Sequence, residues 1–151
     1  MATSRTKTVS TRRRVPAHSP ASANRRIRRG TQQRVTRLAG SGEAIVLRLR
    51  ELDREWDIER AIEANAATLA LAGVALGVLQ DRRWLTLPAL VSAFLLQHAV
   101  QGWCPPVPVL RWMGFRTADE INEERTALKA LRGDFGGLRR SPGRALDAAR
   151  S

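Results

Sequence analysis

The sequence predicts an all-α protein: a two-helix transmembrane hairpin flanked by amphipathic and soluble helices, with a disordered basic tail at the N-terminus. Three observations support this fold class. From Ala64 to Leu110 the only formal charges are Asp81, Arg82 and Arg83, which lie together. The flanking sequence is heavily charged. Apolar residues in those flanks recur at helical spacing. A charge-free block of this length, divided by one short polar turn, is typical of two membrane-spanning helices.

Residues 1–42 form the predicted tail. They contain eleven Lys or Arg residues and no acid, which accounts for nearly all of the net charge of +12. A segment with low hydrophobicity and charge of one sign cannot offset the entropy lost on ordering, so we expect disorder. Residues 5–37 suit a contact with anionic lipid or nucleic acid, and the alternative is a solvated tail without a partner.

Residues 43–60 are predicted to form an amphipathic helix that begins after Ser41. Its apolar residues recur at i, i+4, i+7 and i+11 and form one face: Ile45, Leu49, Leu52 and Trp56. A helix of this kind lies at a membrane surface or packs on a partner. No Gly or Pro intervenes before Gly73, so we expect the helix to continue into the first span.

The predicted hairpin covers residues 61–110, with spans at about 61–79 and 84–103. The second span is the more apolar one, and Trp84 and Trp103 bound it nineteen residues apart. A helix would separate them by about 28 Å, close to the hydrocarbon thickness of about 30 Å. Tryptophans at both boundaries are typical of membrane interfaces. The alternative is the core of a soluble helical bundle, but the flanking helices offer little apolar surface to cover it.

The C-terminal part is predicted to be a cytoplasmic helix over 117–133, followed by a flexible tail over 134–151. Thr117-Ala-Asp-Glu120 matches a capping box, and Gly133 ends the helix. Its apolar stripe is thin, so we expect the helix to be largely solvated or to dock weakly. Lys and Arg are more numerous beside the outer ends of the hairpin than in its turn, which predicts that both termini are cytoplasmic. Four tryptophans are the expected interface anchors: Trp56, Trp84, Trp103 and Trp112.

Small residues at i, i+4 spacing are candidates for close helix packing in lipid. Gly73 and Gly77 form a GxxxG motif in the first span. The other pairs with this spacing are Ala66 with Ala70 and Ala89 with Ala93. The contact would lie within the hairpin or between two copies, and a homodimer is one expected outcome.

A polar stripe near the end of the second span is the candidate for chemistry. Gln97, Gln101 and Cys104 fall at i, i+4 and i+7, and His98 lies beside them. One interpretation is a thiol site at Cys104, with His98 and Gln101 near it and with Arg111 lowering the thiol pKa. The favoured interpretation is that the polar groups hydrogen-bond across the helix pair and Cys104 is a small boundary residue.

The remaining sequence indicates no enzyme, no metal site and no cofactor. The single cysteine excludes an internal disulfide and a multi-cysteine metal site. We find no triad, no phosphate-binding loop and no cluster of metal ligands.

From Ile58-Glu-Arg60 to Gly102-Trp-Cys-Pro105, and on through Met113-Gly-Phe-Arg-Thr117 to about residue 135, the chain resembles a family of small bacterial membrane proteins of unassigned function. Their two-helix hairpin is similar to the membrane part of the inner-membrane rhodanese. The resemblance implies the bacterial inner (plasma) membrane, dimerisation and a link to sulfur or redox chemistry. The chain has no room for a rhodanese domain, so sulfur-transfer activity is not carried over.

We therefore expect an integral membrane protein without catalytic activity, acting as an anchor, a dimer or an accessory subunit in the lipid bilayer. One alternative is a redox-linked or persulfide-carrying membrane protein that acts through Cys104. A second alternative is a membrane tether for nucleic acid, bound by the basic tail.

Overall fold

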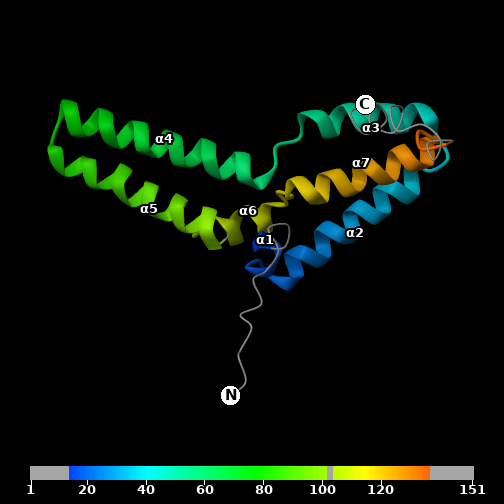
Figure 1. Ribbon diagram of the computed structural model, residues 1–151, viewed down its shortest axis with the longest axis horizontal. Helices are drawn as coiled ribbons and strands as arrows, with labels where there is room; N and C mark the ends of the chain where they lie inside the picture. Colours follow the sequence, from blue (N-terminus) through cyan, green and yellow to red (C-terminus); the bar gives the residue numbers. More distant parts are fainter. Residues whose placement is uncertain (1–13, 102–103, 137–151) are drawn as a thin grey trace, which may run out of the picture. The chain divides into compact units, whose positions relative to one another are not determined.

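The computed structural model describes residues 14–101 and 104–136 of the chain. Every regular element in these ranges is helical, which confirms the predicted all-α class. In chain order (Figure 1) the elements are α1 (Arg14–Ala17), α2 (Ala21–Leu38), α3 (Gly42–Arg54), α4 (Ile58–Leu79), the 3-10 turn η2 (Arg82–Leu85), α5 (Thr86–Gln101), α6 (Val107–Met113) and α7 (Ala118–Arg132).

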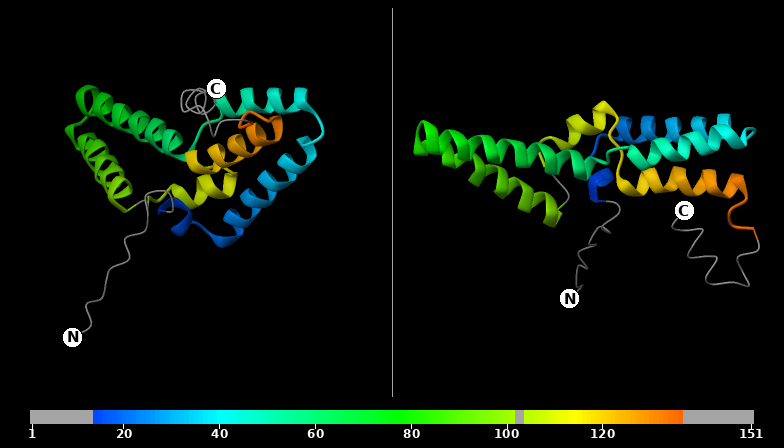
Figure 2. Two further views of the ribbon diagram at one scale, coloured as in Figure 1. Left: turned by 45° about the vertical axis from the view of Figure 1, so that its right-hand side comes forward. Right: turned by 90° about the horizontal axis from the view of Figure 1, so that it is seen from above.

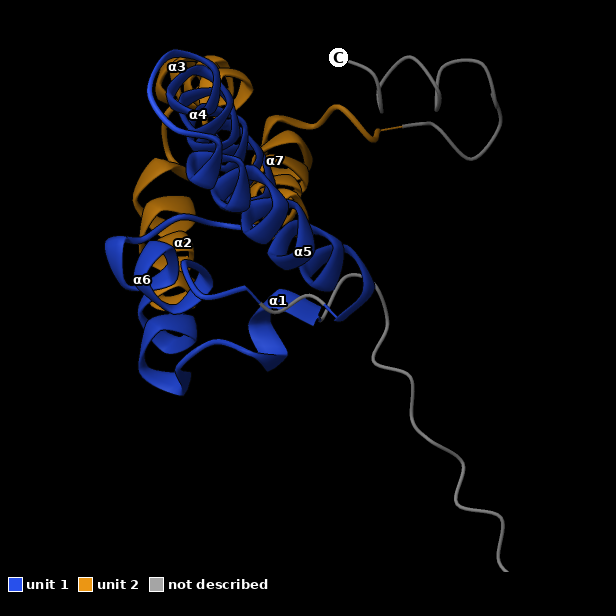
Figure 3. Ribbon diagram, turned by 90° about the vertical axis from the view of Figure 1, so that its left-hand side faces the viewer, with its two compact units in different colours: residues 1–26, 56–117 blue, residues 27–55, 118–151 orange. Residues whose placement is uncertain are grey.

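The chain divides into two compact units (Figure 3). Unit 1 comprises residues up to 26 together with 56–117, and unit 2 comprises residues 27–55 together with the chain from 118 onward. Each unit contains its own buried apolar cluster. The described chain therefore folds around two cores rather than one.

In unit 1, α4 and α5 lie side by side and η2 joins them (Figures 1 and 2). The buried cluster of this unit lies where α4 begins, and it draws on α1, α4, α6 and the segment before α6. Its members are Val15, Ile58, Ala61, Ile62, Cys104, Val107 and Leu110, with Phe94, Leu95 and Phe115 packed against them.

The start of α4 differs from the expected continuous helix. α3 ends at Arg54, and α4 begins only at Ile58. The Asp57 carboxylate accepts a hydrogen bond from the Arg60 backbone N–H at 2.7 Å, which caps the new helix. The Ile58 N–H donates to the Arg116 carbonyl at 2.8 Å. A local cap and one long-range hydrogen bond thus end the run that the apolar pattern alone would extend.

The N-terminal tail is also more ordered than predicted, because α1 and α2 lie within residues 1–42. Val15 is 6% exposed in the unit 1 cluster, and Ala23 and Ile27 are buried along α2. The Asn24 side chain donates to the Pro16 carbonyl at 2.8 Å and fixes the turn between the two helices. These tertiary contacts supply the stabilisation that composition alone lacks. Residues 1–13 and 137–151, where further tail was predicted, lie outside the described residues.

Unit 2 is built from α2 from residue 27 onward, α3 and α7. Its apolar cluster contains Ile45, Leu49, Leu52, Ile121 and Leu128, with Val35 and Leu38 packed against it. α3 begins after Ser41, whose hydroxyl accepts from the Ala44 N–H at 3.3 Å. α7 is less solvated than expected, because Leu128 is fully buried and α7 packs on α3.

One helical stretch of the described chain, within Gly42–Leu79, is long and apolar enough to cross a membrane. Its uncharged part is Ala64–Leu79 in α4. The predicted second span begins later than expected, at Thr86 instead of residue 84, because residues 82–85 form η2. Its described helix, α5, has 16 residues, or about 24 Å. Trp84 therefore lies in η2 rather than in α5, and Trp103 lies outside the described residues.

Candidate functional site

The contact between α4 and α5 depends on two glycines of α4. A Cβ atom on Gly73 would lie 2.6 Å from Pro88 Cδ and 3.1 Å from Leu87 Cβ. A Cβ atom on Gly77 would lie 2.6 Å from Leu85 Cδ2. Neither distance leaves room for a side chain, so these glycines let the second helix and its turn approach closely. In this structure the GxxxG motif packs within the helix pair.

The other small residues fall in two environments. Ala66 and Ala70 are half-buried on α4, whereas Ala89 and Ala93 are exposed on α5. The sequence spacing is the same in both pairs, and only the α5 pair is on the outer surface of unit 1.

Large aliphatic side chains cover the outer surface of the pair. Leu71 is 71% exposed, Val78 77% and Leu79 80% on α4. Leu96 and Val100 are 67% and 66% exposed on α5. No residue of α5 is buried, and the buried residues of α4 beyond Ile62 are its two glycines. The apolar bulk of this pair therefore faces outward, and its inner contact is made by small residues.

Charged residues surround the end of the pair that lies away from η2. The Arg14 guanidinium donates to the Ala99 carbonyl at 2.8 Å and to the Val100 carbonyl at 3.3 Å, and so satisfies carbonyls in the last turn of α5. The Arg60 guanidinium lies 4.5 Å from the Trp56 ring centroid, a cation–π contact. These hydrogen bonds of Arg14 could not be predicted from the sequence, because the acceptor carbonyls are 85 and 86 residues away along the chain.

The described tryptophans lie at both ends of unit 1. Trp84 is 44% exposed in η2, Trp56 is 47% exposed before α4, and Trp112 is 71% exposed on α6. Trp103 is not among the described residues. Each described indole is thus accessible on the surface, and none is the centre of a buried cluster.

The predicted thiol site does not assemble as an accessible pocket. Cys104 is 5% exposed in the apolar cluster of unit 1, whereas Gln101 is exposed on α5 and Gln97 is half-buried. Burial raises the pKa of the Cys104 thiol, so the expected lowering by Arg111 is wrong. The Arg111 guanidinium instead donates to the Asn24 side chain at 2.6 Å and to the Phe115 carbonyl at 3.1 Å. His98 Nδ1 is buried and has no hydrogen-bond partner within the described chain.

Unit 2 contains a buried carboxylate that sequence reasoning missed. Glu124 of α7 is fully buried and accepts hydrogen bonds from Arg34 of α2 and Arg48 of α3, both at 2.8 Å. Burial alone would lower the pKa of Arg48, but hydrogen bonds to Glu124 and Glu51 outweigh it and leave that pKa raised. The partners of Glu124 are 90 and 76 residues away along the chain, so no local pattern marks it.

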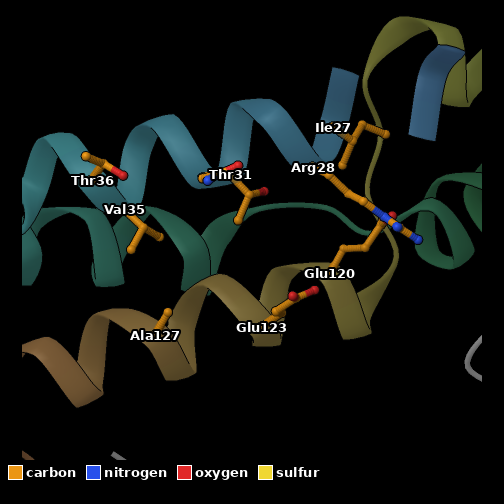
Figure 4. Close-up of a pocket in the computed structure, with 9 residues that line it drawn as sticks. Ile27, Arg28, Thr31, Val35, Thr36, Glu120, Glu123 and Ala127 are labelled. Carbon is orange, nitrogen blue, oxygen red and sulfur yellow. The ribbon is translucent and has the colours of Figure 1, made fainter. Parts of the chain in front are cut away.

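A groove of about 380 Å³ separates α2 from α7 in unit 2 (Figure 4). Side chains from both helices point into it: Ile27, Arg28, Thr31, Gln32, Val35, Thr36, Glu120, Glu123 and Ala127. The lining combines aliphatic, hydroxyl and charged groups, and it includes neither His nor Cys. The hydroxyl groups of the lining are those of Thr31 and Thr36, and no histidine of the lining lies beside them to act as a general base.

Among residues 14–101 and 104–136, no three His, Cys, Asp or Glu side chains come together in a way that could hold a metal ion. The structure does bring together the two glycines of α4 with η2 and the start of α5, and, in unit 2, Glu124 with Arg34 and Arg48. In comparisons with protein-family models, curated proteins and solved structures, nothing matches this chain.

Proposed function

We propose that the protein is a membrane anchor: α4, η2 and α5 insert into a bilayer as a helical hairpin, and the charged unit 2 remains in water. The observation that carries this proposal is the outward exposure of the aliphatic side chains of the pair. In water each exposed leucine or valine forgoes about 1.5–3 kcal/mol of burial free energy. Lipid removes that cost, and the glycine contact then supplies the packing between helices.

The length of the pair supports an inserted hairpin with a small mismatch. The uncharged part of α4 and the whole of α5 have 16 residues each, about 24 Å. A hydrocarbon core of about 30 Å accommodates a shorter hairpin by local thinning. Trp84 at the turn and the Arg60–Trp56 pair at the other end are amphipathic groups suited to the two boundaries.

The charges of unit 1 support an orientation with both termini in the cytoplasm. Arginines cluster at the open end of the pair, and the turn carries only Arg82 and Arg83 beside Asp81. The open-end set is Arg14, Arg25, Arg26, Arg60, Arg111 and Arg116. The side richer in arginine is retained in the cytoplasm.

The resemblance to small bacterial membrane proteins leads us to propose the bacterial inner membrane as the location.

The same proposal assigns contact between copies to α5. Gly73 and Gly77 are occupied by the intramolecular contact, whereas Ala89 and Ala93 are exposed small residues at i, i+4. A homodimer in the bilayer would use that stripe. Cross-linking in membranes should decrease in Ala93→Leu and persist in Ala72→Leu, since Ala72 lies on the exposed side of α4. Equal cross-linking in the two variants would remove α5 from the dimer contact.

Carbonate extraction of membranes tests the anchor itself. The wild-type chain should stay with the membrane pellet. The double variant Leu71→Arg, Leu96→Arg should be released from the membrane pellet, because each central arginine costs about 2.5–3.5 kcal/mol of insertion free energy. Leu47→Arg is the matched control, since Leu47 is an exposed leucine of unit 2. A wild-type chain that is soluble and monodisperse without detergent would overturn the proposal.

The thiol alternative has no supporting observation, because the only cysteine is buried and its pKa is raised. The nucleic-acid alternative rests on the arginines of residues 5–37. Three of them already make protein contacts: Arg14, Arg26 and Arg34. The membrane anchor is therefore the function that we propose.

A further inference from the structure

Helix α6 presents an apolar face that the core of unit 1 does not use. Val107, Leu110 and Arg111 of this short helix are buried. On its other side Val109 is 57% exposed and Met113 64%. Trp112, 71% exposed, lies between them in sequence. The helix is thus amphipathic in an unusual sense, with an arginine inside and a tryptophan outside.

Hydrogen bonds of the buried Arg111 and of the end of the helix fix the orientation of this exposed face. The buried Arg111 guanidinium bonds to Asn24 Oδ1 at 2.6 Å and to the Phe115 carbonyl at 3.1 Å. Gly114 has a φ of 102° and ends the helix, and the Phe115 N–H donates back to the Leu110 carbonyl at 3.0 Å. A residue with a side chain would be strained at that φ. These contacts fix Trp112 and Met113 outward.

Positive charge lies directly beside this face. The Arg26 guanidinium donates to the backbone carbonyl of Trp112, and the neighbouring Arg25 is exposed on the same helix, α2. An indole and a thioether next to guanidinium groups match the boundary of an anionic bilayer, where apolar side chains enter the acyl region and arginines meet phosphates.

We infer that α6 is an interfacial helix that binds anionic phospholipid: Val109, Trp112 and Met113 enter the bilayer surface, and the exposed Arg25 contacts the lipid phosphates. This inference rests on the proposed anchor, because α6 begins six residues after α5 ends and so lies near the place where the hairpin leaves the bilayer. Binding of α6 to the bilayer surface would fix how deeply the hairpin inserts and would favour leaflets rich in anionic lipid. Lipid is preferred to a protein partner because the apolar face and the arginines adjoin the proposed exit point of the hairpin.

The test uses the full chain in vesicles, with Trp56, Trp84 and Trp103 changed to Phe so that Trp112 alone reports. In vesicles of phosphatidylcholine mixed with phosphatidylglycerol, Trp112 emission should shift to the blue and be quenched by lipids brominated near the headgroup. In pure phosphatidylcholine the shift should be smaller. Arg25→Gln should lower the equilibrium constant for docking of α6 on these vesicles, obtained from the extent of the shift, by about fivefold, the effect of one basic group near the surface. Arg50→Gln, an exposed arginine of α3, should leave it unchanged.

Three results would overturn the inference. Trp112 could remain open to an aqueous quencher in anionic vesicles, or it could respond equally to neutral and anionic lipid. Its blue shift could also depend on the protein-to-lipid ratio, which would assign the face to a contact between protein molecules. A cysteine at Val74, in a Cys104→Ser background, reports on the hairpin in the same vesicles. Labelling of that cysteine by an impermeant reagent would count against the anchor itself, whatever Trp112 reports.

Discussion

The α4–α5 pair and unit 2 are both made of packed helices, yet their polarity is opposite. In the pair, glycines form the contact and the leucines and valines face outward. In unit 2, Leu128 and Ile45 are buried, and arginines and acids cover the surface. Unit 2 follows the rule for a protein in water. The pair has the opposite arrangement, which the proposed insertion explains, because close packing of small residues drives helix association in lipid.

The two regions also differ in how they treat charge. Unit 2 buries one carboxylate, Glu124, and compensates it with Arg34 and Arg48. The uncharged lengths of α4 and α5 contain no ionised group to compensate. A substitution that changes charge should therefore act on unit 2 through its folding, and on the pair through the proposed insertion into lipid.

The largest effect on folding is expected from Glu124→Ala. It leaves Arg34 and Arg48 without their shared carboxylate and should destabilise unit 2 by about 3 kcal/mol, the lower end of the cost of breaking a buried pair. The lower end applies because the Arg34 side chain is 35% exposed and can reach water. Thermal unfolding and protease resistance of the full chain measure this loss.

Glu123→Ala is the matched control, because Glu123 is an exposed carboxylate of α7 at the edge of the groove. It should leave unfolding nearly unchanged. If the two alanine variants unfold at the same temperature, Glu124 does not hold the three helices together.

A somewhat smaller effect is expected from Gly73→Leu. The new side chain would meet Pro88 Cδ and Leu87, so α4 and α5 must separate at a cost of about 1–3 kcal/mol. Denaturant unfolding in detergent should shift accordingly. Ala72→Leu places the same side chain on the exposed side of α4 and should be tolerated. Equal shifts in the two variants would mean that the glycine contact contributes nothing to the pair.

The smallest effect concerns the reactivity of Cys104. Because burial raises its pKa, the thiolate fraction at neutral pH is below that of an ordinary thiol. Alkylation of the folded chain should be at least about tenfold slower than that of the unfolded chain, and its rate should still rise as the pH passes the usual thiol range. A fast reaction that levels off near pH 7 would restore the thiol alternative.

Sequence patterns located what depends on local chemistry. The charge-free block, the turn at Asp81 and the start of α3 after Ser41 all follow from composition and capping, because the residues responsible lie within a few positions of each other. The GxxxG motif was recognised, but its partner was not. Whether Gly73 faces α5 or a second copy depends on how α4 is rotated about its axis, and the sequence of α4 does not determine that.

What the sequence did not indicate depends on distant contacts. α2 was predicted as disordered because its eighteen residues include six arginines and no acid, yet Ile27 and Ala23 are buried and Arg34 binds Glu124. The break at Glu55–Asp57 was missed because an apolar pattern carries no information about the Arg116 carbonyl that receives the Ile58 N–H. The packing of Cys104 and Val15 in one buried cluster was missed for the same reason, because it depends on a contact between residues far apart in the sequence.

Accessibility of single cysteines tests the difference between the two regions most directly. In a Cys104→Ser background, cysteines at Val74 and Leu96 of the pair, Arg83 of the turn and Leu47 of unit 2 are labelled in oriented membrane vesicles by an impermeant maleimide. Val74 and Leu96 should stay unlabelled until detergent is added, Arg83 should be labelled only from the outside, and Leu47 only from the cytoplasmic side. Labelling of Val74 and Leu96 at the rate of Leu47 in intact membranes would contradict the conclusion that lipid surrounds the pair.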